Sequence, residues 1–256
     1  VLQRPEARNA MNKPMATATC DAIAACQDAG CIVLTGEDPA FCAGLDLRDL
    51  GADTLAELPG FIGAAASSQV PIIAAVNGPA VTGGFELALA CDFIVASERA
   101  ACADTHLRVG VYPGPVLVDL PRRVGEAWAR EMSLTGDFVD AATALRIGIA
   151  NHVVAHDELV PFAVRKAHAI AEQPRDMVAT MRKDWEATVG TPRGEARRIH
   201  AEHVALAYLG QPRQDFRFTF DAAAGDRLGE QRRRHPRKRD PCDRRMREMP
   251  GLGLNA

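Results

Sequence analysis

Short apolar runs alternate with longer amphipathic stretches along the first 156 residues of the chain. The short runs are rich in aliphatic residues and predict buried strands over residues 31–35, 72–77, 93–96 and 152–154. Between them, apolar residues recur at a spacing of about three to four and predict helices over residues 47–50, 83–91, 116–123 and 141–147. Strands that alternate with helices indicate an α/β fold.

The pattern becomes almost wholly helical from residue 157 onward. Apolar spacing predicts helices over residues 157–172, 174–188 and 193–209. Residues 226–248 are rich in Lys and Arg, contain Pro236 and Pro241, and lack apolar periodicity, which predicts a disordered tail. We therefore expect a core of residues 1–156, a helical segment of residues 157–225 and a basic tail of residues 226–256.

The composition indicates one main globular domain, since 47% of the 256 residues are hydrophobic and 25% are charged. A formal net charge of −3 gives no reason to expect a nucleic acid or a membrane as partner. Asn77, Glu86 and Asp92 interrupt the longest apolar stretch, which excludes a membrane span there. The seven cysteines include no C-x-x-C pair, so reduced thiols and a cytoplasmic location are expected.

The most informative segment for chemistry is residues 71–92, in which a buried strand leads through a turn to Gly83 and Gly84 at the start of a helix. The first N–H groups of a helix have no acceptor within it, and the helix dipole makes that end electropositive. An oxyanion is therefore a suitable ligand for this junction. The alternative is that the paired glycines only allow the helix to pack closely on the sheet.

A second junction of the same kind lies upstream in residues 41–47. Gly44 is suited to the turn, Asp46 to capping the next helix, and the Leu45 N–H would then be a free donor. Two such donors that converge on one point form an oxyanion hole, in which each donor contributes about 3 to 4 kcal/mol to catalysis in comparable enzymes.

These junctions belong to an ordered set of segments that resembles the crotonase (enoyl-CoA hydratase/isomerase) family. The matching segments are residues 4–12, 33–36, 41–47, 71–92, 110–114 and 134–136. The resemblance implies a spiral of β-β-α units with a C-terminal helical segment for trimerisation, and a homotrimer or a dimer of trimers. It also implies an acyl-CoA substrate, with no cofactor other than the coenzyme A that the substrate carries. Residues 1–3 resemble the end of the family's first strand, so we expect the core to lack the start of that strand in this sequence.

The resemblance assigns roles to particular residues of this chain. Leu45 and Gly83 match the two oxyanion-hole donors of the family. The residues at the positions that contact the substrate or its CoA moiety are Arg8, Ala10, Ala43, Asp46, Leu47 and Gly84.

Two positions match the acid–base residues of the family's hydratases. Glu86 matches the glutamate that activates water, although a carboxylate in the first turn of a helix also simply complements the helix dipole. His106 stands where the family has its second glutamate, which supplies a proton. Histidine exchanges a proton near neutral pH, so His106 is a candidate general acid; the alternative is a packing histidine in a protein that has lost part of the activity. The expected reaction is hydration of a 2-enoyl-CoA, and isomerisation, thioester hydrolysis or decarboxylation are the alternatives.

Two further signals point to other classes of protein. His200 with His203, and His152 with His156, have spacings that allow a metal, but no third ligand is evident, so no metal is expected. The basic tail suits RNA or another polyanion, which leaves a non-catalytic acyl-CoA-binding or RNA-binding protein as the second hypothesis. Short basic tails without interleaved aromatic residues are usually just solvated.

Overall fold

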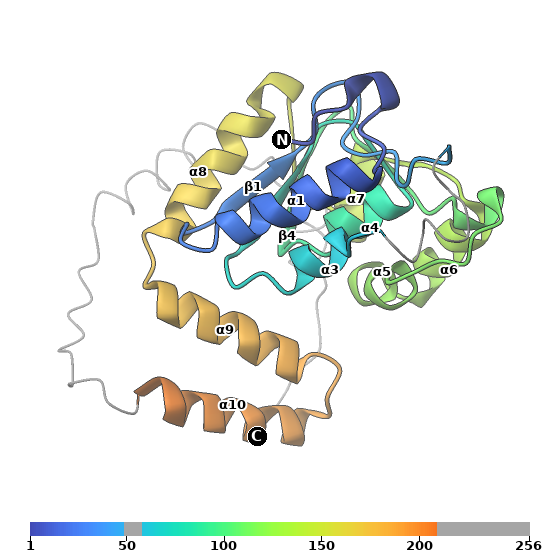
Figure 1. Cartoon of the computed structure of the whole chain (residues 1–256). Helices are drawn as coiled ribbons and strands as arrows, with labels where there is room; N and C mark the ends of the chain where they lie inside the picture. The colour runs from blue at the N-terminus through green and yellow to red at the C-terminus, as the bar shows by residue number, and fades with distance from the viewer. Residues whose placement is uncertain (49–57, 209–256) are drawn as a thin grey trace, which may run out of the picture. The chain divides into compact units, whose positions relative to one another are not determined.

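A parallel sheet of four strands forms the centre of the chain (Figure 1). The computed structural model describes residues 1–48 and 58–208, which up to Ala207 form one compact unit. The strands are β1 (Ile32–Thr35), β2 (Ile72–Val76), β4 (Phe93–Ser97) and β7 (His152–Val154), in the order β1-β2-β4-β7. All their pairings are parallel. The four strands predicted from the sequence are therefore confirmed, with ends that differ by a residue at most.

Helices cover both faces of this sheet, and β2 shows how its sequence divides between them. Successive side chains of a strand point to opposite faces. Ile72, Ala74 and Val76 face the cluster that contains α1 (Lys13–Ala25), α3 (Phe61–Ala66) and α4 (Gly83–Leu89). Ile73 and Ala75 face Leu159 and Ala163 of α8 (Leu159–Ala171). Because both faces are covered, every residue of β2 is buried, and its sequence is a continuous apolar run.

A second, smaller sheet lies beside the two junctions predicted from the sequence. Its strands are β3 (Pro79–Val81), β5 (Ala101–Ala103) and β6 (Val139–Asp140), with β5 in the middle. β3 follows β2 and precedes α4, so the chain order strand, strand, helix is that of the expected β-β-α unit. Cys42 forms a single parallel bridge with Ala80 of β3, and Leu45 forms one with Met11. These bridges hold residues 42–45 beside the start of α4.

Most of the predicted helices are present. The remaining helices of the described residues are η1 (Pro5–Ala7), η2 (His106–Val109), α5 (Val116–Val124), α6 (Glu126–Thr135), α7 (Ala141–Ile147), η3 (His156–Glu158), α9 (Arg175–Thr188) and α10 (Arg193–Tyr208), where η marks a 3-10 helix. The pattern did not predict α1, α3 or α6. For α1 a capping signal exists, because the Asn12 side chain accepts a hydrogen bond from Met15 N at 3.1 Å and Pro14 lies in the first turn.

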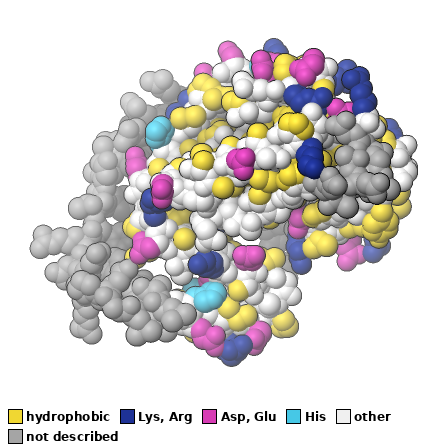
Figure 2. Space-filling view, viewed as in Figure 1, with side chains coloured by type: hydrophobic (Ala, Val, Ile, Leu, Met, Phe, Trp, Pro, Cys, Tyr) yellow, Lys and Arg dark blue, Asp and Glu magenta, His cyan; other side chains and the backbone are white. Residues whose placement is uncertain are grey.

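Several predictions from the sequence lie wholly or partly outside the described residues. Residues 47–48 form a turn, and the rest of the helix expected over residues 47–50 is not among the described residues. Neither are the end of the helix expected over residues 193–209, the rest of the helical segment up to residue 225, and the tail of residues 226–256. Within the described ranges, no helix combines the length and apolarity that crossing a membrane would require. On the face shown in Figure 2, Lys and Arg side chains are interspersed with Asp and Glu among the described atoms.

Helix α9 is tied to the core by Arg182. Its guanidinium donates to both carboxylate oxygens of Asp92, at 2.6 and 3.1 Å, and to the carbonyl of Ser68. Asp92 also accepts from the N–H of Ile72, at the start of β2, at 2.8 Å. The carboxylate therefore joins the central strand to α9 through a bidentate ion pair.

We expect Arg182→Ala to lower the free energy of unfolding by about 1.5 to 3 kcal/mol, because the Asp92 carboxylate, whose side chain is 23% exposed, loses its charged partner. Chemical denaturation measures this change. Arg198→Ala is the matched control, since Arg198 pairs with Glu195 and Glu202 on the exposed surface of α10 and should contribute little. Equal effects of the two substitutions would contradict a structural role for the link between Arg182 and Asp92.

Candidate active site

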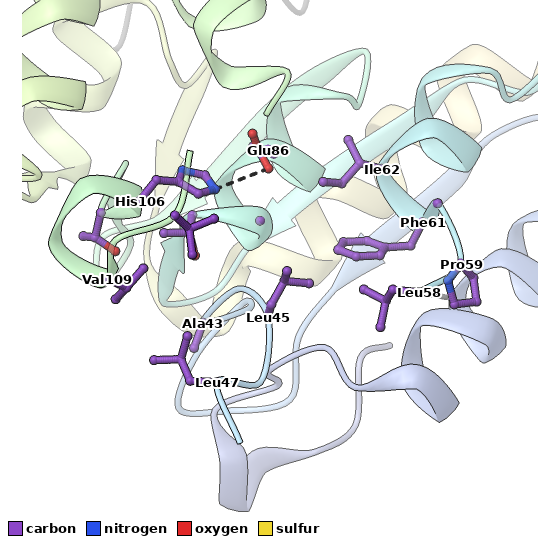
Figure 3. A pocket seen from close by; sticks show the side chains of 15 residues that line it. Ala43, Leu45, Leu47, Leu58, Pro59, Phe61, Ile62, Glu86, His106 and Val109 are labelled. Carbon is purple, nitrogen blue, oxygen red and sulfur yellow. Dashed lines mark ion pairs between the residues drawn. The ribbon is translucent and has the colours of Figure 1, made fainter. Parts of the chain in front are cut away.

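A cavity of about 320 Å³ opens where residues 43–47, the start of α3, the start of α4 and η2 meet (Figure 3). Its lining is mostly apolar, with Glu86 and His106 as the titratable groups among its described residues. The lining residues are Ala43, Leu45, Leu47, Leu58, Pro59, Gly60, Phe61, Ile62, Thr82, Gly83, Glu86, Thr105, His106, Val109 and Val111. A mostly apolar cavity with a few convergent polar groups is typical of a small-molecule site.

The two predicted backbone donors, at Leu45 and Gly83, are adjacent at the cavity wall. A methyl group in place of the Gly83 α-hydrogen would lie 3.8 Å from the Leu45 nitrogen. Within the described residues, neither N–H donates a hydrogen bond. Gly83 is the first residue of α4, where an N–H has no acceptor in the helix. The pair is therefore free to bind one oxygen atom.

The neighbouring glycines serve close packing. A Cβ atom on Gly84 would lie 2.1 Å from the carbonyl oxygen of Cys42, and one on Gly44 would lie 2.0 Å from the hydroxyl of Thr82. Gly44 also has a positive φ of 92°, which favours glycine. Thr82 adopts a positive φ of 47°, an uncommon conformation for a β-branched residue, directly before Gly83. The packing interpretation therefore holds for Gly84, which packs against residues 41–47. Gly83 lines the cavity, and its role in binding an oxyanion stays a prediction.

Glu86 projects from the first turn of α4 into the cavity and is only 4% exposed (Figure 3). Its Oε1 accepts a hydrogen bond from the N–H of Val116 at 3.2 Å. Burial raises the pKa of this carboxyl, while the hydrogen bond from Val116 and the charge of His106 act in the opposite direction and are outweighed. A Cβ on Gly114 would lie 2.9 Å from Oε1, so a larger residue there would displace the carboxylate.

His106 begins η2 and faces Glu86 across the cavity (Figure 3). Its Nε2 lies 3.8 Å from Glu86 Oε2, and its Nδ1 lies 2.6 Å from Oδ1 of Asp104. Burial disfavours the charged imidazolium, but the hydrogen bond with Asp104 and the negative charge of Glu86 outweigh burial and raise the pKa of His106. The two candidate acid–base residues are therefore in contact and share one cavity.

The predicted CoA-contacting residues occupy different settings. Ala43 and Leu47 line the cavity, whereas Ala10 and Gly84 are buried outside its lining. Arg8 is exposed, and its carbonyl accepts from Ala43 N at 3.0 Å.

Asp46, the last of these residues, is already occupied by an ion pair. Arg4 donates to its carboxylate at 2.9 Å and holds the pKa of Asp46 below its usual range. The Asp46 side chain therefore links residues 43–47 to Arg4.

Sequence reasoning missed two kinds of site residue. The apolar side chains of Phe61, Ile62 and Val109 line the cavity, but their hydrophobic pattern does not distinguish them from core residues. Asp104 is the other omission. Its spacing of two residues from His106 is a signal, because a carboxylate at this distance commonly bonds to a following residue's backbone and side chain.

Comparison with known proteins places the whole described chain beside acyl-CoA enzymes. The sequence model of the family described as enoyl-CoA hydratase/isomerase matches residues 1–214. A probable enoyl-CoA hydratase of Rhizobium meliloti is 41% identical over 179 residues, which are 66% of this chain and 70% of that protein. The crotonyl-CoA hydratase of Syntrophomonas wolfei is 32% identical over 227 residues, which are 84% of this chain and 87% of that protein.

Solved structures agree with the sequence matches. The crystal structure of an enoyl-CoA hydratase from Mycobacterium smegmatis superposes with a TM-score of 0.74 at 30% identity, and covers 80% of this chain and 84% of its own. The expected α/β spiral fold is therefore confirmed.

We expect Gly84→Ala to lower the free energy of unfolding by about 1 to 3 kcal/mol, because the added methyl group overlaps the Cys42 carbonyl. Gly83→Ala is the matched control one residue away, where the nearest atoms would lie at an ordinary 3.8 Å. Thermal or chemical unfolding of both variants measures the difference. A Gly84→Ala variant as stable as Gly83→Ala would contradict the close packing of α4 on residues 41–47.

Proposed function

The chain belongs to the enoyl-CoA hydratase/isomerase family, and from that premise we propose that it adds water across the double bond of a 2-enoyl-CoA to give a 3-hydroxyacyl-CoA. The names of its relatives, which include enoyl-CoA and crotonyl-CoA hydratases, support this reaction. The observation that carries the proposal is that Glu86 and His106 line the same cavity as Leu45 and Gly83. A base, an acid and two free N–H donors are the groups that this reaction needs.

The thioester oxygen binds between the N–H groups of Leu45 and Gly83. Attack of water at the β-carbon moves electrons through the double bond onto this oxygen and produces an enolate. The two hydrogen bonds strengthen as that charge develops, so they stabilise the transition state more than the substrate. A cavity lined mainly by apolar side chains excludes water and increases this effect.

Glu86 is the base in this reaction. Val116 holds Oε1, which leaves Oε2 to accept a proton from the attacking water while the hydroxyl bonds to the β-carbon. The raised pKa brings the basicity of the carboxylate closer to what proton abstraction near neutral pH requires.

His106 is the acid. Its Nε2 delivers a proton to the α-carbon of the enolate, which completes the addition of one water molecule. Glu86 then carries the extra proton and His106 lacks one. Because the two groups are 3.8 Å apart, a small movement returns the proton from Oε2 to Nε2 and restores both groups.

Binding of the CoA moiety and assembly of the subunits extend the proposal. We assign the CoA contacts to Arg8, Ala10, Ala43, Asp46, Leu47 and Gly84, as the family resemblance implies. CoA arrives as part of the substrate, and we propose no resident cofactor or metal. A homotrimer or dimer of trimers built through residues 157–225, and a cytoplasmic location, are parts of the same proposal.

We expect Glu86→Gln to lower kcat for hydration of crotonyl-CoA by about 10² to 10⁴, since the amide does not accept a proton from water. Loss of the conjugated thioester absorbance measures the rate. Glu126→Gln on the exposed surface of α6 is the control and should retain wild-type kcat. Retention of CoA-ester binding by Glu86→Gln would separate loss of chemistry from loss of the site. Wild-type protein that binds but hydrates none of a series of 2-enoyl-CoA esters would overturn the proposed function.

The pH dependence of kcat should be bell-shaped. Glu86 acts only when deprotonated, so kcat rises as the pH increases through its raised pKa, above the ordinary value of 4.5. His106 acts only when protonated, so kcat falls as the pH increases through its raised pKa, above the ordinary value of 6.5. We expect His106→Asn to lower kcat and to remove the alkaline fall. An unchanged alkaline fall in that variant would return His106 to a packing role.

A further inference from the structure

Asp104 is a buried carboxylate directly behind His106, and it contributes nothing to the cavity wall. It follows β5, and it is 1% exposed. Its Oδ1 lies 2.6 Å from His106 Nδ1 and accepts from the backbone N–H of His106 at 3.4 Å. Its Oδ2 has no hydrogen-bond partner among the described residues. In the described part of the chain, the hydrogen bonds of Oδ1 are thus made to His106.

Holding the backbone N–H of His106 does not require a charged side chain at position 104. Asparagine offers the same side-chain oxygen to a backbone N–H two residues later, and burying an amide costs less than burying a carboxylate. Burial opposes the charged form of Asp104. The hydrogen bond with the side chain of His106 and an interaction with the side chain of Ser133 outweigh burial and lower the pKa of the Asp104 carboxyl. Asp104 is therefore held as a buried anion beside the candidate acid.

We infer that Asp104 is a positioning residue for His106, which keeps the Nδ1 proton, directs Nε2 toward Glu86 and the substrate, and stabilises the imidazolium until it protonates the α-carbon. This inference rests on the proposed hydration. The proton that Asp104 retains is on Nδ1, so the proton delivered is the one on Nε2. After delivery the ring is neutral with Nδ1 still protonated, which is the form that accepts a proton back from Glu86 at Nε2.

The charges around His106 fit this role. In the described part of the chain, the charged groups that act on its pKa are Asp104, from the segment after β5, and Glu86, from α4. Arg108, in the same 3-10 helix, turns outward and donates to the Thr135 carbonyl at 3.0 Å and to Asp137 at 2.6 Å. Two carboxylates on opposite sides of the ring therefore favour the imidazolium.

Asp104→Asn removes the negative charge but keeps the side-chain oxygen that bonds the backbone N–H of His106. The amide oxygen still accepts from the His106 N–H, so a purely structural role predicts near wild-type kcat and an unchanged pH profile. The positioning role predicts that the alkaline fall of kcat moves to lower pH. Because the imidazolium loses a charged partner, we expect kcat to decrease about tenfold at alkaline pH and much less on the acidic side. KM for crotonyl-CoA should change little, because Asp104 does not line the cavity.

A double-mutant cycle tests whether Asp104 acts through His106. In a His106→Asn background, Asp104→Asn should lower kcat no further, whereas independent effects would multiply. Asp184→Asn is the matched control. Asp184 is not among the residues that line the cavity, and its carboxylate lies 2.6 Å from His200 Nδ1 and 2.8 Å from His203 Nδ1. This substitution should leave the pH profile of kcat unchanged. Unfolding curves of all variants show whether the fold is retained.

The outcomes distinguish this inference from the proposed function. An active wild type whose alkaline limb does not move in Asp104→Asn, or multiplicative effects in the cycle, would overturn the role of Asp104 alone. A wild type with no hydratase activity would overturn the proposed function and this inference with it.

Discussion

The proposed chemistry of this chain depends on keeping two backbone N–H groups, those of Leu45 and Gly83, side by side in one cavity wall. They come from segments far apart in sequence, and each segment is fixed by the other. Gly84 packs on the Cys42 carbonyl at a distance that excludes a side chain, and Gly44 does the same against Thr82. The bridge between Cys42 and β3 sets the register of that contact. The proposed oxyanion-binding pair thus follows from backbone packing and needs no particular side chain.

The acid–base groups add a second constraint, because the fold buries three titratable side chains in contact. Glu86 and Asp104 flank His106, and burial acts against the charged form of each. Their mutual contacts decide the result: the pKa of His106 rises and that of Asp104 falls, while the carboxyl of Glu86 keeps a raised pKa. A histidine between two carboxylates differs from a second glutamate, since the proposed acid carries a positive charge before it donates its proton.

Sequence alone located the central strands, because continuous apolar runs are strong local signals, and it singled out Leu45 and Gly83, which the structure brings to one cavity wall. Every residue of β2 could be predicted as buried. The short strands β3, β5 and β6 were not predicted, because their pairing with one another is long-range. The sequence also could not predict that Gly84 packs on Cys42 while Gly83 lines the cavity, because this depends on which α-hydrogen faces Cys42. Asp104 was missed because its burial against His106 follows from the fold.

The central claim is that Leu45 and Gly83 polarise a thioester carbonyl, and the vibration of that carbonyl tests it most directly. Glu86→Gln would hold an enoyl-CoA labelled with ¹³C at the thioester carbon without turning it over, and difference infrared spectroscopy would record the bound carbonyl stretch. We predict a lower frequency than for the free thioester in water, and a smaller decrease when Gly83→Ala is added. A bound carbonyl whose frequency equals or exceeds that of the free thioester would contradict this claim.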